Sequence, residues 1–376
     1  MRTRMLCANI FFQFSLDAGV RYWCKVSFRP LIYLQRCRTC VRREGRLIQL
    51  SSEHAARSLR IGYESLPDDM KGAYKRLRSA VLSREKELTI NDPDGRVYEH
   101  ASKIFFAVRQ DDPYLFYLGK TLVCEETVGG VVFTPAYLFN LFKERCILKK
   151  IEHVTDEMLK GLPDDTFDRE IEIHKRVTES ITFPADYNDG VRREEYQTLV
   201  GAFLNREAVC SGTANAMNLL LNRAGIRCGT IRGNNSKGAG HAWNIVELEG
   251  KLYHLDASID TKDNVLLFEM FNVTDEACRS AGYSWECGFE CNEQTMEYYS
   301  YTKSHVCTAD IMEFVAERLS NGEREIFFKI SDPENWNRNK HADVITSYLS
   351  KTIAPATVVL LMDEEKGTAK LTIRRL

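Results

Sequence analysis

Residues 241–256 read HAWNIVELEGKLYHLD, and this stretch decides the fold of the chain. The first eight residues alternate between apolar and polar in the manner of a half-buried strand, and the last six return in the same way. Between them, Glu249-Gly250 has the composition of a two-residue hairpin turn. The stretch therefore predicts an antiparallel β-hairpin.

The register of this hairpin follows from the length of its turn. With two turn residues, Leu248 pairs with Lys251, and Trp243 then faces Asp256. His241 lies one diagonal step from Asp256, on the same side of the sheet. Cross-strand diagonals are about 7–8 Å long, a gap that an imidazole and a carboxylate close with a hydrogen bond. A turn of odd length would place the two side chains on opposite faces.

A cysteine precedes a helical pattern upstream of the hairpin. Cys210 stands in VCSGTA, just before the run ANAMNLLL at 214–221, which lacks Gly and Pro and has helical spacing. We expect Cys210 at the helix N-terminus, where free N–H groups and the helix dipole favour a thiolate. Cys210, His241 and Asp256 are then a candidate catalytic triad in which His241 accepts the thiol proton and Asp256 fixes the tautomer. The alternative is a small core cysteine, a satisfied strand histidine and a strand-end aspartate.

Acyl transfer also requires donors for the negative charge on the attacked carbonyl oxygen. The backbone N–H of Cys210 is the first candidate. Gln197 is the second, although a polar surface turn explains its segment equally well. Trp243 and Asn244 are expected to line the substrate side of the site, and a core role suits Trp243 equally.

Four stretches of the chain carry a resemblance to a known family: EAVCSG at 207–212, LLNRAGI at 220–226, GHAWNIV at 240–246 and YHLDAS at 253–258. Together they resemble the core of the transglutaminase-like superfamily, and its bacterial branch looks closest. The resemblance is specific over about residues 170–300, weaker over 65–170 and absent before 50. It implies an α+β, papain-like fold, in which a helix bearing the cysteine packs on an antiparallel sheet bearing the histidine and the aspartate. Relatives often have Thr-Trp after the aspartate, where this chain has Ala257-Ser258, so substrate contacts are expected to differ.

The patterns divide the chain into four parts. Residues 1–50 are an atypical basic, cysteine-containing segment; 60–165 form a helical and partly extended accessory domain; 166–300 form the catalytic domain; 301–376 form a small α/β region. Outside the triad region we predict helices at 68–88, 98–108, 157–162, 168–180, 309–319 and 342–349, and strands within 122–137 and at 325–330, 357–362 and 369–373.

The first 47 residues differ in charge from the rest. They hold ten Lys or Arg and two acids, a balance of +8, so a net charge of -2 for the chain leaves -10 for the remainder. Because the rest of the chain is this acidic, it is not expected to bind nucleic acid. The segment lacks a helical or strand period and a convincing signal-peptide cleavage site. It is interpreted as disordered, as a transit segment, or as non-native sequence upstream of the true start.

Composition indicates a soluble globular protein: 44% of residues are hydrophobic, 28% are charged, and no apolar run is long enough for a membrane span. Without a signal, a cytoplasmic location is expected, with a secreted or surface-associated one as the alternative. The sequence implies no cofactor and no metal, and the calcium loop motif is not found. Oligomeric state is left open.

Three functions compete at this point. The first is a cysteine peptidase or amidase that hydrolyses peptide or peptide-like substrates, such as cell-wall peptides. The second is a transglutaminase that joins Gln side chains to amines. The third is a catalytically silent binding module with the same fold. The first two use the same triad and differ in the acyl acceptor, which the sequence does not reveal.

Overall fold

The computed structural model describes residues 38–187, 190, 193–263, 266–352, 356–364 and 366–375. The chain divides into two units, residues 1–44 and 45–376, and the second unit contains the elements discussed below. The interpretations given for residues 1–37 lie outside the described residues.

A long helix occupies the end of the segment that was predicted to lack structure. Helix α1 (Arg38–Arg57) begins in the first unit and continues into the second. Leu47 and Leu50 are buried in the main core, one turn apart on the same face. The prediction for residues 1–50 is therefore wrong for its last part. The apolar stripe of this helix is short and stands among closely spaced arginines, so the sequence pattern did not indicate a helix. The stripe is recognised only when the surface on which it packs is known.

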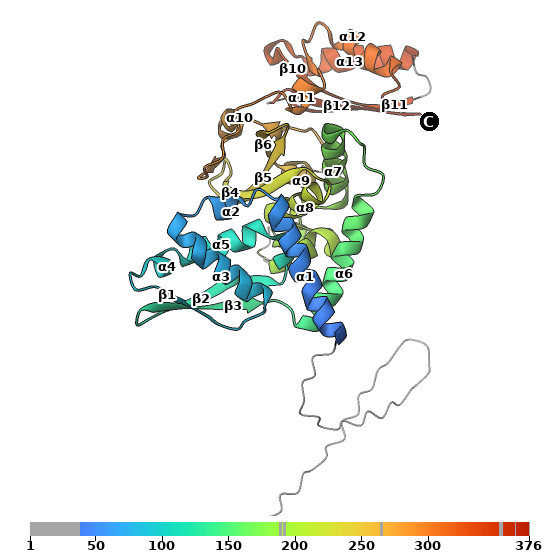
Figure 1. The fold of residues 1–376 in the computed structure, drawn as a ribbon. Coiled ribbons are helices and arrows are strands. Elements are labelled where there is room, and N and C mark those ends of the chain that lie inside the picture. The colour runs from blue at the N-terminus through green and yellow to red at the C-terminus, as the bar shows by residue number, and fades with distance from the viewer. Residues whose placement is uncertain are drawn as a thin grey trace, which may run out of the picture. The chain divides into compact units, whose positions relative to one another are not determined.

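The region that precedes residue 166 contains α2 (Ile61–Glu64), η1 (Asp68–Met70), α3 (Lys71–Leu82), β1 (Leu88–Asn91), α4 (Arg96–Glu99), α5 (Ala101–Asp111), η2 (Pro113–Leu115), β2 (Leu118–Thr127), β3 (Gly130–Tyr137) and α6 (Leu141–Met158). The three strands form an antiparallel sheet in the order β1-β3-β2 (Figure 1). Helix α6 was missed by the sequence patterns, although its buried positions Ile147, Leu148, Ile151 and Thr155 have helical spacing.

Two consecutive aspartates hold this region together. The Asp111 carboxylate accepts hydrogen bonds from the backbone N–H groups of Gly62 (2.7 Å) and Tyr63 (2.8 Å) at the start of α2. The Asp112 carboxylate forms an ion pair with Arg78 of α3 at 2.8 Å. Proline follows these aspartates, which explains why α5 ends there.

The segment predicted to be catalytic contains α7 (Thr166–Ser180), η3 (Ala185–Tyr187), η4 (Glu194–Gln197), a π-helical turn η5 (Val200–Asn205), α8 (Cys210–Arg223), β4 (Arg227–Asn234), β5 (Gly240–Leu248), β6 (Lys251–Leu255), α9 (Ala257–Asp263), β7 (Phe271–Val273), α10 (Asp275–Ser280) and β8 (Ser284–Trp285). Its five-stranded sheet has the order β7-β6-β5-β4-β8, and every pairing is antiparallel. Helix α8 packs on β4 and β5 (Figure 1). The predicted α+β fold is confirmed.

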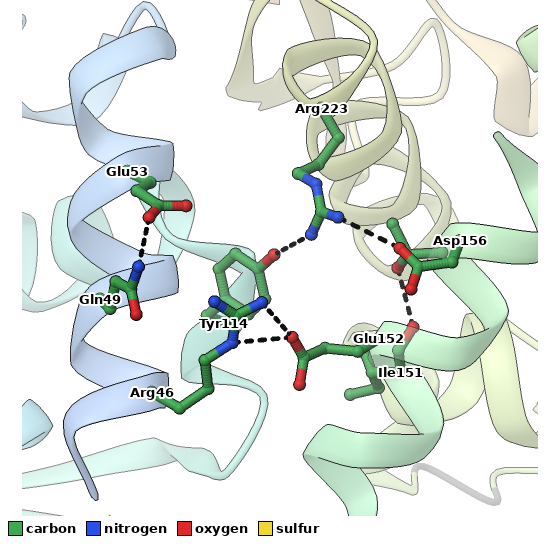
Figure 2. Close-up of polar contacts among 9 residues, drawn as sticks. Arg46, Gln49, Glu53, Tyr114, Ile151, Glu152, Asp156 and Arg223 are labelled. Atoms are coloured by element: carbon green, nitrogen blue, oxygen red, sulfur yellow. Dashed lines mark hydrogen bonds and ion pairs between the residues drawn. The ribbon is translucent and has the colours of Figure 1, made fainter. Parts of the chain in front are cut away.

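Helix α8 is fixed at its C-terminal end by its neighbours. Arg223 donates to the Tyr114 hydroxyl at 3.3 Å and forms an ion pair with Asp156 of α6 at 3.2 Å (Figure 2). In the same view, Arg46 of α1 forms an ion pair with Glu152 of α6 at 2.8 Å. Exposed pairs of this kind contribute only about 0–1 kcal/mol each, so the buried face of α8 supplies most of the packing free energy.

The C-terminal region contains α11 (Tyr298–Tyr301), β9 (His305–Val306), α12 (Ile311–Ser320), β10 (Glu325–Ile330), η6 (Pro333–Asn335), α13 (Arg338–Thr352), β11 (Ala356–Asp363) and β12 (Thr368–Arg375). Its sheet has the order β11-β12-β10-β9 and encloses a small separate core that includes Val315, Phe328 and Leu371. The elements predicted at 325–330, 342–349, 357–362 and 369–373 lie within β10, α13, β11 and β12, and the helix predicted at 309–319 begins two residues before α12. No helix of the described residues is both long and apolar enough to cross a membrane.

Candidate active site

The hairpin has the register that its turn predicts. Leu248 pairs with Lys251, and the pairing continues in step to Asn244 and Leu255 at the end of β6. Both turn residues, Glu249 and Gly250, have positive φ (50° and 74°), as the two-residue hairpin turn requires. The strand ends at Leu255, so Asp256 is the first residue beyond it.

This register brings His241 and Asp256 together. The His241 Nε2 atom lies 2.6 Å from Asp256 Oδ2. The Asp256 carboxylate is held by three further donors: the Tyr283 hydroxyl at 2.8 Å on Oδ2, and the backbone N–H and hydroxyl of Ser258 at 3.0 and 2.6 Å on Oδ1. Although burial by itself raises the pKa of Asp256, the hydrogen bond and charge of His241 lower it overall, helped by Ser258 and Tyr283.

Cys210 is the first residue of α8 and is half-buried. The Val209 carbonyl accepts from the N–H groups of Gly212 and Thr213, at 2.9 and 3.1 Å. Among the described residues, the N–H groups of Cys210 and Ser211 have no hydrogen-bond acceptor, as expected for the first residues of a helix. Two free donors therefore lie at the sulfur-bearing end of α8.

The charge state of His241 depends on both partners. Burial by itself lowers its pKa, but the hydrogen bond and charge of Asp256, followed by a hydrogen bond and charge from Cys210, raise it to about 10. Since Nε2 is bonded to Asp256, Nδ1 is the ring nitrogen that remains for the sulfur. The raised pKa favours the positively charged ring at neutral pH, and positive charge beside a thiol favours its thiolate form.

The position of Gln197 depends on a very close approach between η4 and the first turn of α8. A Cβ atom on Gly212 would stand 2.4 Å from the Tyr196 carbonyl oxygen, so only glycine allows η4 to pack against the first turn of α8. The Asn215 side chain of α8 donates to the Gln197 backbone carbonyl at 3.1 Å. Gln197 is half-buried and lines a small cavity together with Ser211. Its side-chain amide has no hydrogen-bond partner among the described residues.

Trp243 and Asn244, which were expected to line the site with a core role as the alternative for Trp243, are both buried. Trp243 is fully buried, stacks behind the His241 ring and donates from Nε1 to Nδ1 of His254 at 3.0 Å. Asn244 is 1% exposed and donates to the Ala214 carbonyl of α8 at 3.0 Å. Side chains alternate between the two faces of β5. Both faces of this central strand are covered, so Trp243 and Asn244 are buried on opposite sides of the sheet.

A second histidine–aspartate pair lies beside the first and was not predicted. His254 Nε2 lies 2.8 Å from Asp275 Oδ1, and the Cys291 backbone N–H donates to the same oxygen at 3.3 Å. Ligand-type atoms of these three residues lie within 4.8 Å of one another. However, the Trp243 N–H requires His254 Nδ1 to accept, so Nε2 carries the proton that bonds to Asp275. An ion could bind there only by breaking both hydrogen bonds, so the trio is better explained as support for Trp243.

Tyr283 and Ser258, which hold Asp256, were also missed as functional residues. Ser258 is the second residue of α9 and lies two positions after Asp256, so its contact is local. Tyr283 has no spacing signal, because it reaches the carboxylate from the loop before β8. His241 itself lies on the wall of a cleft with a volume of about 670 Å³, whose lining is rich in polar side chains, among them Ser258, Lys237 and Glu269.

The site therefore combines a helix with a cysteine at its head and an antiparallel sheet that carries a histidine bonded to an aspartate. A comparison with protein families agrees with the resemblance seen in the sequence: residues 152–257 match the model of the transglutaminase-like superfamily.

Two solved structures are also similar. One is described as the crystal structure of a TGase, with 14% identity, a TM-score of 0.30, and coverage of 62% of this chain and 68% of the other. The second is a candidate cysteine protease from Cytophaga hutchinsonii, with 10% identity, a TM-score of 0.25, and coverage of 37% of this chain and 61% of the other. No match is found among curated proteins.

Proposed function

We propose that the chain is a cysteine peptidase or amidase that cleaves amide bonds in peptide or peptide-like substrates with Cys210, His241 and Asp256. One observation carries the proposal: Asp256 holds the imidazole at 2.6 Å through Nε2, while the other side of the ring serves Cys210. This is the order of groups that nucleophilic catalysis by a thiol requires.

In the proposed reaction, the Cys210 sulfur attacks the carbonyl carbon of the amide and the negative charge moves to the carbonyl oxygen. The free N–H of Cys210 and the side-chain amide of Gln197 supply donors for that oxygen. Cys210 begins α8, and Gln197 of η4 lies against the first turns of the same helix, which supports this assignment. His241 gives its Nδ1 proton to the leaving amine as the C–N bond breaks, and a thioester remains. His241 then accepts a proton from water, which attacks the thioester and releases the carboxylic acid and the thiol.

Hydrolysis is preferred to amine transfer because His241 lies on an open cleft with a polar lining, where water reaches the base. Transamidation, with an amine in place of water, is the alternative at the same site. Peptides, including cell-wall peptides, are the proposed substrates.

Alkylation by iodoacetamide, with the site located by mass spectrometry, tests the nucleophile. An ordinary thiol with a pKa of about 8.5 is only about 3% ionised at pH 7. As the proposed nucleophile, Cys210 is expected to be alkylated about tenfold faster or more than an ordinary thiol. Cys146 and Cys307 are exposed and serve as controls within the same molecule. Faster labelling at either control than at Cys210 would contradict the proposal.

A second experiment separates the acceptors. The chain and its Cys210→Ala variant are incubated with a panel of peptides and muropeptides, with and without a fluorescent amine. Release of free carboxylate by the parent chain alone supports hydrolysis. Incorporation of the amine into a Gln peptide, without hydrolysis, would replace this proposal with transglutamination.

A further inference from the structure

Two arginines from distant parts of the chain lie together beside the candidate nucleophile. Arg109 is on α5 and Arg232 is on β4, and both line one small cavity. Arg232 pairs with Ala242 across the sheet, which places its side chain on the sheet face that α8 covers. The remaining lining residues of the cavity are Gln110, Gln197, Ser211, Asn215, Thr230 and Ala242.

Neither guanidinium group is paired with a carboxylate in the described part of the chain, where neither Arg109 nor Arg232 has a side-chain hydrogen bond or an ion pair. Each lies over an aromatic ring: the Arg232 guanidinium is 4.9 Å from the Phe106 ring centre, and that of Arg109 is 6.0 Å from the Phe105 ring centre. Glu194 is the carboxylate that acts on Arg109, and it already accepts a hydrogen bond from a backbone N–H.

The electrostatics of the pair are unfavourable without an anion. Burial, and then the positive charge of Arg232, lower the pKa of Arg109 to about 10. Burial also lowers the pKa of Arg232, whereas the charge of Cys210 raises it. Two desolvated like charges repel one another, and a negative group between them relieves the repulsion and satisfies their donors.

The space at the arginines suits one end of a larger ligand. The cavity that they share has a volume of about 20 Å³, enough for one water-sized group such as a carboxylate oxygen. An adjoining open groove of about 890 Å³ shares Gln110 and Arg232 with the cavity and runs between α2 and α5 on one side and β4 and β8 on the other. The accessory region therefore supplies one wall of this groove.

We propose that Arg109 and Arg232 form a subsite that binds a carboxylate of the substrate next to the bond attacked by Cys210. The substrate class is then an anionic peptide, with either an acidic side chain or a free C-terminal carboxylate close to the cleaved amide. This inference rests on the proposed function of Cys210 and adds the specificity of the same site.

Paired alkylating reagents test the subsite without knowledge of the substrate. Iodoacetate carries a carboxylate and iodoacetamide is its neutral counterpart, so the ratio of their rates at Cys210, divided by the same ratio for glutathione, reports binding of the anion. We expect the ratio to exceed that of glutathione by about tenfold or more, the effect of one or two charge-assisted hydrogen bonds. It should fall toward the glutathione value in Arg109→Gln and Arg232→Gln.

Arg227→Gln is the matched control, because it removes the same charge from the same strand about 16 Å away and leaves the cavity intact. The control should keep the parent ratio. The inference is overturned if the parent chain shows no preference for iodoacetate, or if Arg109→Gln and Arg232→Gln slow both reagents equally, since that would mean support of the thiolate alone. Slow reaction of Cys210 with both reagents in the parent chain would instead reject the proposed function itself.

Peptide pairs then identify the source of the carboxylate. One pair differs by Glu against Gln beside the cleaved bond, and the other by a free against an amidated C-terminus. In one of the two pairs, we expect the anionic peptide to be cleaved with about tenfold higher kcat/KM than its neutral counterpart. This preference should disappear in Arg232→Gln. Equal rates within both pairs would overturn the anionic substrate class.

Discussion

Replacement of Asp256 by asparagine removes a charge from a carboxylate that accepts four hydrogen bonds. Oδ2 accepts from His241 and Tyr283, and Oδ1 accepts from the N–H and hydroxyl of Ser258. An asparagine has only one acceptor oxygen, and its NH2 group takes the place of the other carboxylate oxygen. The NH2 group must therefore face either the two donors on Oδ1 or the two donors on Oδ2. The Ser258 backbone N–H cannot turn away, whereas the Tyr283 hydroxyl can rotate and His241 can give up its Nε2 proton. We therefore expect the NH2 group to face His241.

The consequence is a neutral histidine in the wrong tautomer. With the side-chain amide introduced by Asp256→Asn donating to Nε2, the remaining proton of His241 lies on Nδ1, where it can no longer accept the thiol proton of Cys210. A charge-assisted hydrogen bond contributes about 1.5–3 kcal/mol. At about 1.4 kcal/mol per pKa unit, the pKa of His241 should fall by about 1–2 units from its value of about 10 in the parent chain.

The sign of the stability effect follows from the two pKa shifts. His241 has a folded pKa above its ordinary 6.5, so its contribution to stability is complete below pH 6.5 and is lost as the pH rises through about 10. Asp256 has a lowered pKa, so its contribution is present above about pH 4 and is lost in acid. The difference in unfolding free energy between the parent and Asp256→Asn should therefore be largest between about pH 4 and 6.5, at about 1.5–3 kcal/mol.

Three measurements examine this prediction: urea unfolding across pH, NMR titration of His241, and the pH profile of Cys210 alkylation by iodoacetamide. Alkylation at pH 7 should slow by about 10- to 100-fold if the imidazolium supports the thiolate. Tyr283→Phe is the control, since it removes one neutral donor from Asp256, keeps the charge, and should cost only about 1 kcal/mol. An unchanged His241 pKa with an unchanged alkylation profile would refute the reasoning.

Three further changes have expected outcomes. Gln197→Ala should lower kcat by about 10²–10³-fold with a smaller effect on KM, if its amide donates to the oxyanion, and equal kinetics would remove Gln197 from that role. Gly212→Ala should lower the unfolding free energy by about 1–3 kcal/mol because its Cβ meets the Tyr196 carbonyl at 2.4 Å, whereas Gly72→Ala, with open space around it, should be neutral or stabilising in the same urea unfolding assay. Glu170 is buried with a pKa raised to about 8, so the parent chain should lose up to about 4–5 kcal/mol relative to Glu170→Gln as the pH rises from about 4.5 to 8, and parallel stability curves would contradict this.

The catalytic hairpin could be predicted because its information is local. Strand alternation and a two-residue turn with positive φ fix the register, and the register alone sets which side chains share a face. Helix α8 was equally accessible, since an apolar run without Gly or Pro begins shortly after Cys210. The pairing of His241 with Asp256 therefore follows from sixteen consecutive residues. The chemical roles of these residues remain predictions.

The burial of Trp243, Asn244 and part of helix α1 has a common cause in long-range packing. Trp243 and Asn244 have strand positions that suit either a cleft wall or the core, and they are buried because Trp285 covers one face of β5 and α8 covers the other. Helix α1 was not recognised because its two core leucines are embedded among arginines, and only the rest of the fold supplies the surface that buries them. Local sequence does not record which face of an element will later be covered.

What the sequence determined by itself is the set of reacting groups: a thiol at a helix start, and an imidazole and a carboxylate one diagonal apart. What only the tertiary structure decided is their environment. Tyr283 reaches Asp256 from the loop before β8, η4 approaches α8 through a glycine, and α5 brings Arg109 to Arg232 across more than a hundred residues. Such contacts depend on where whole elements pack, and packing is set by the complementary shapes of distant surfaces, which no short stretch of sequence specifies.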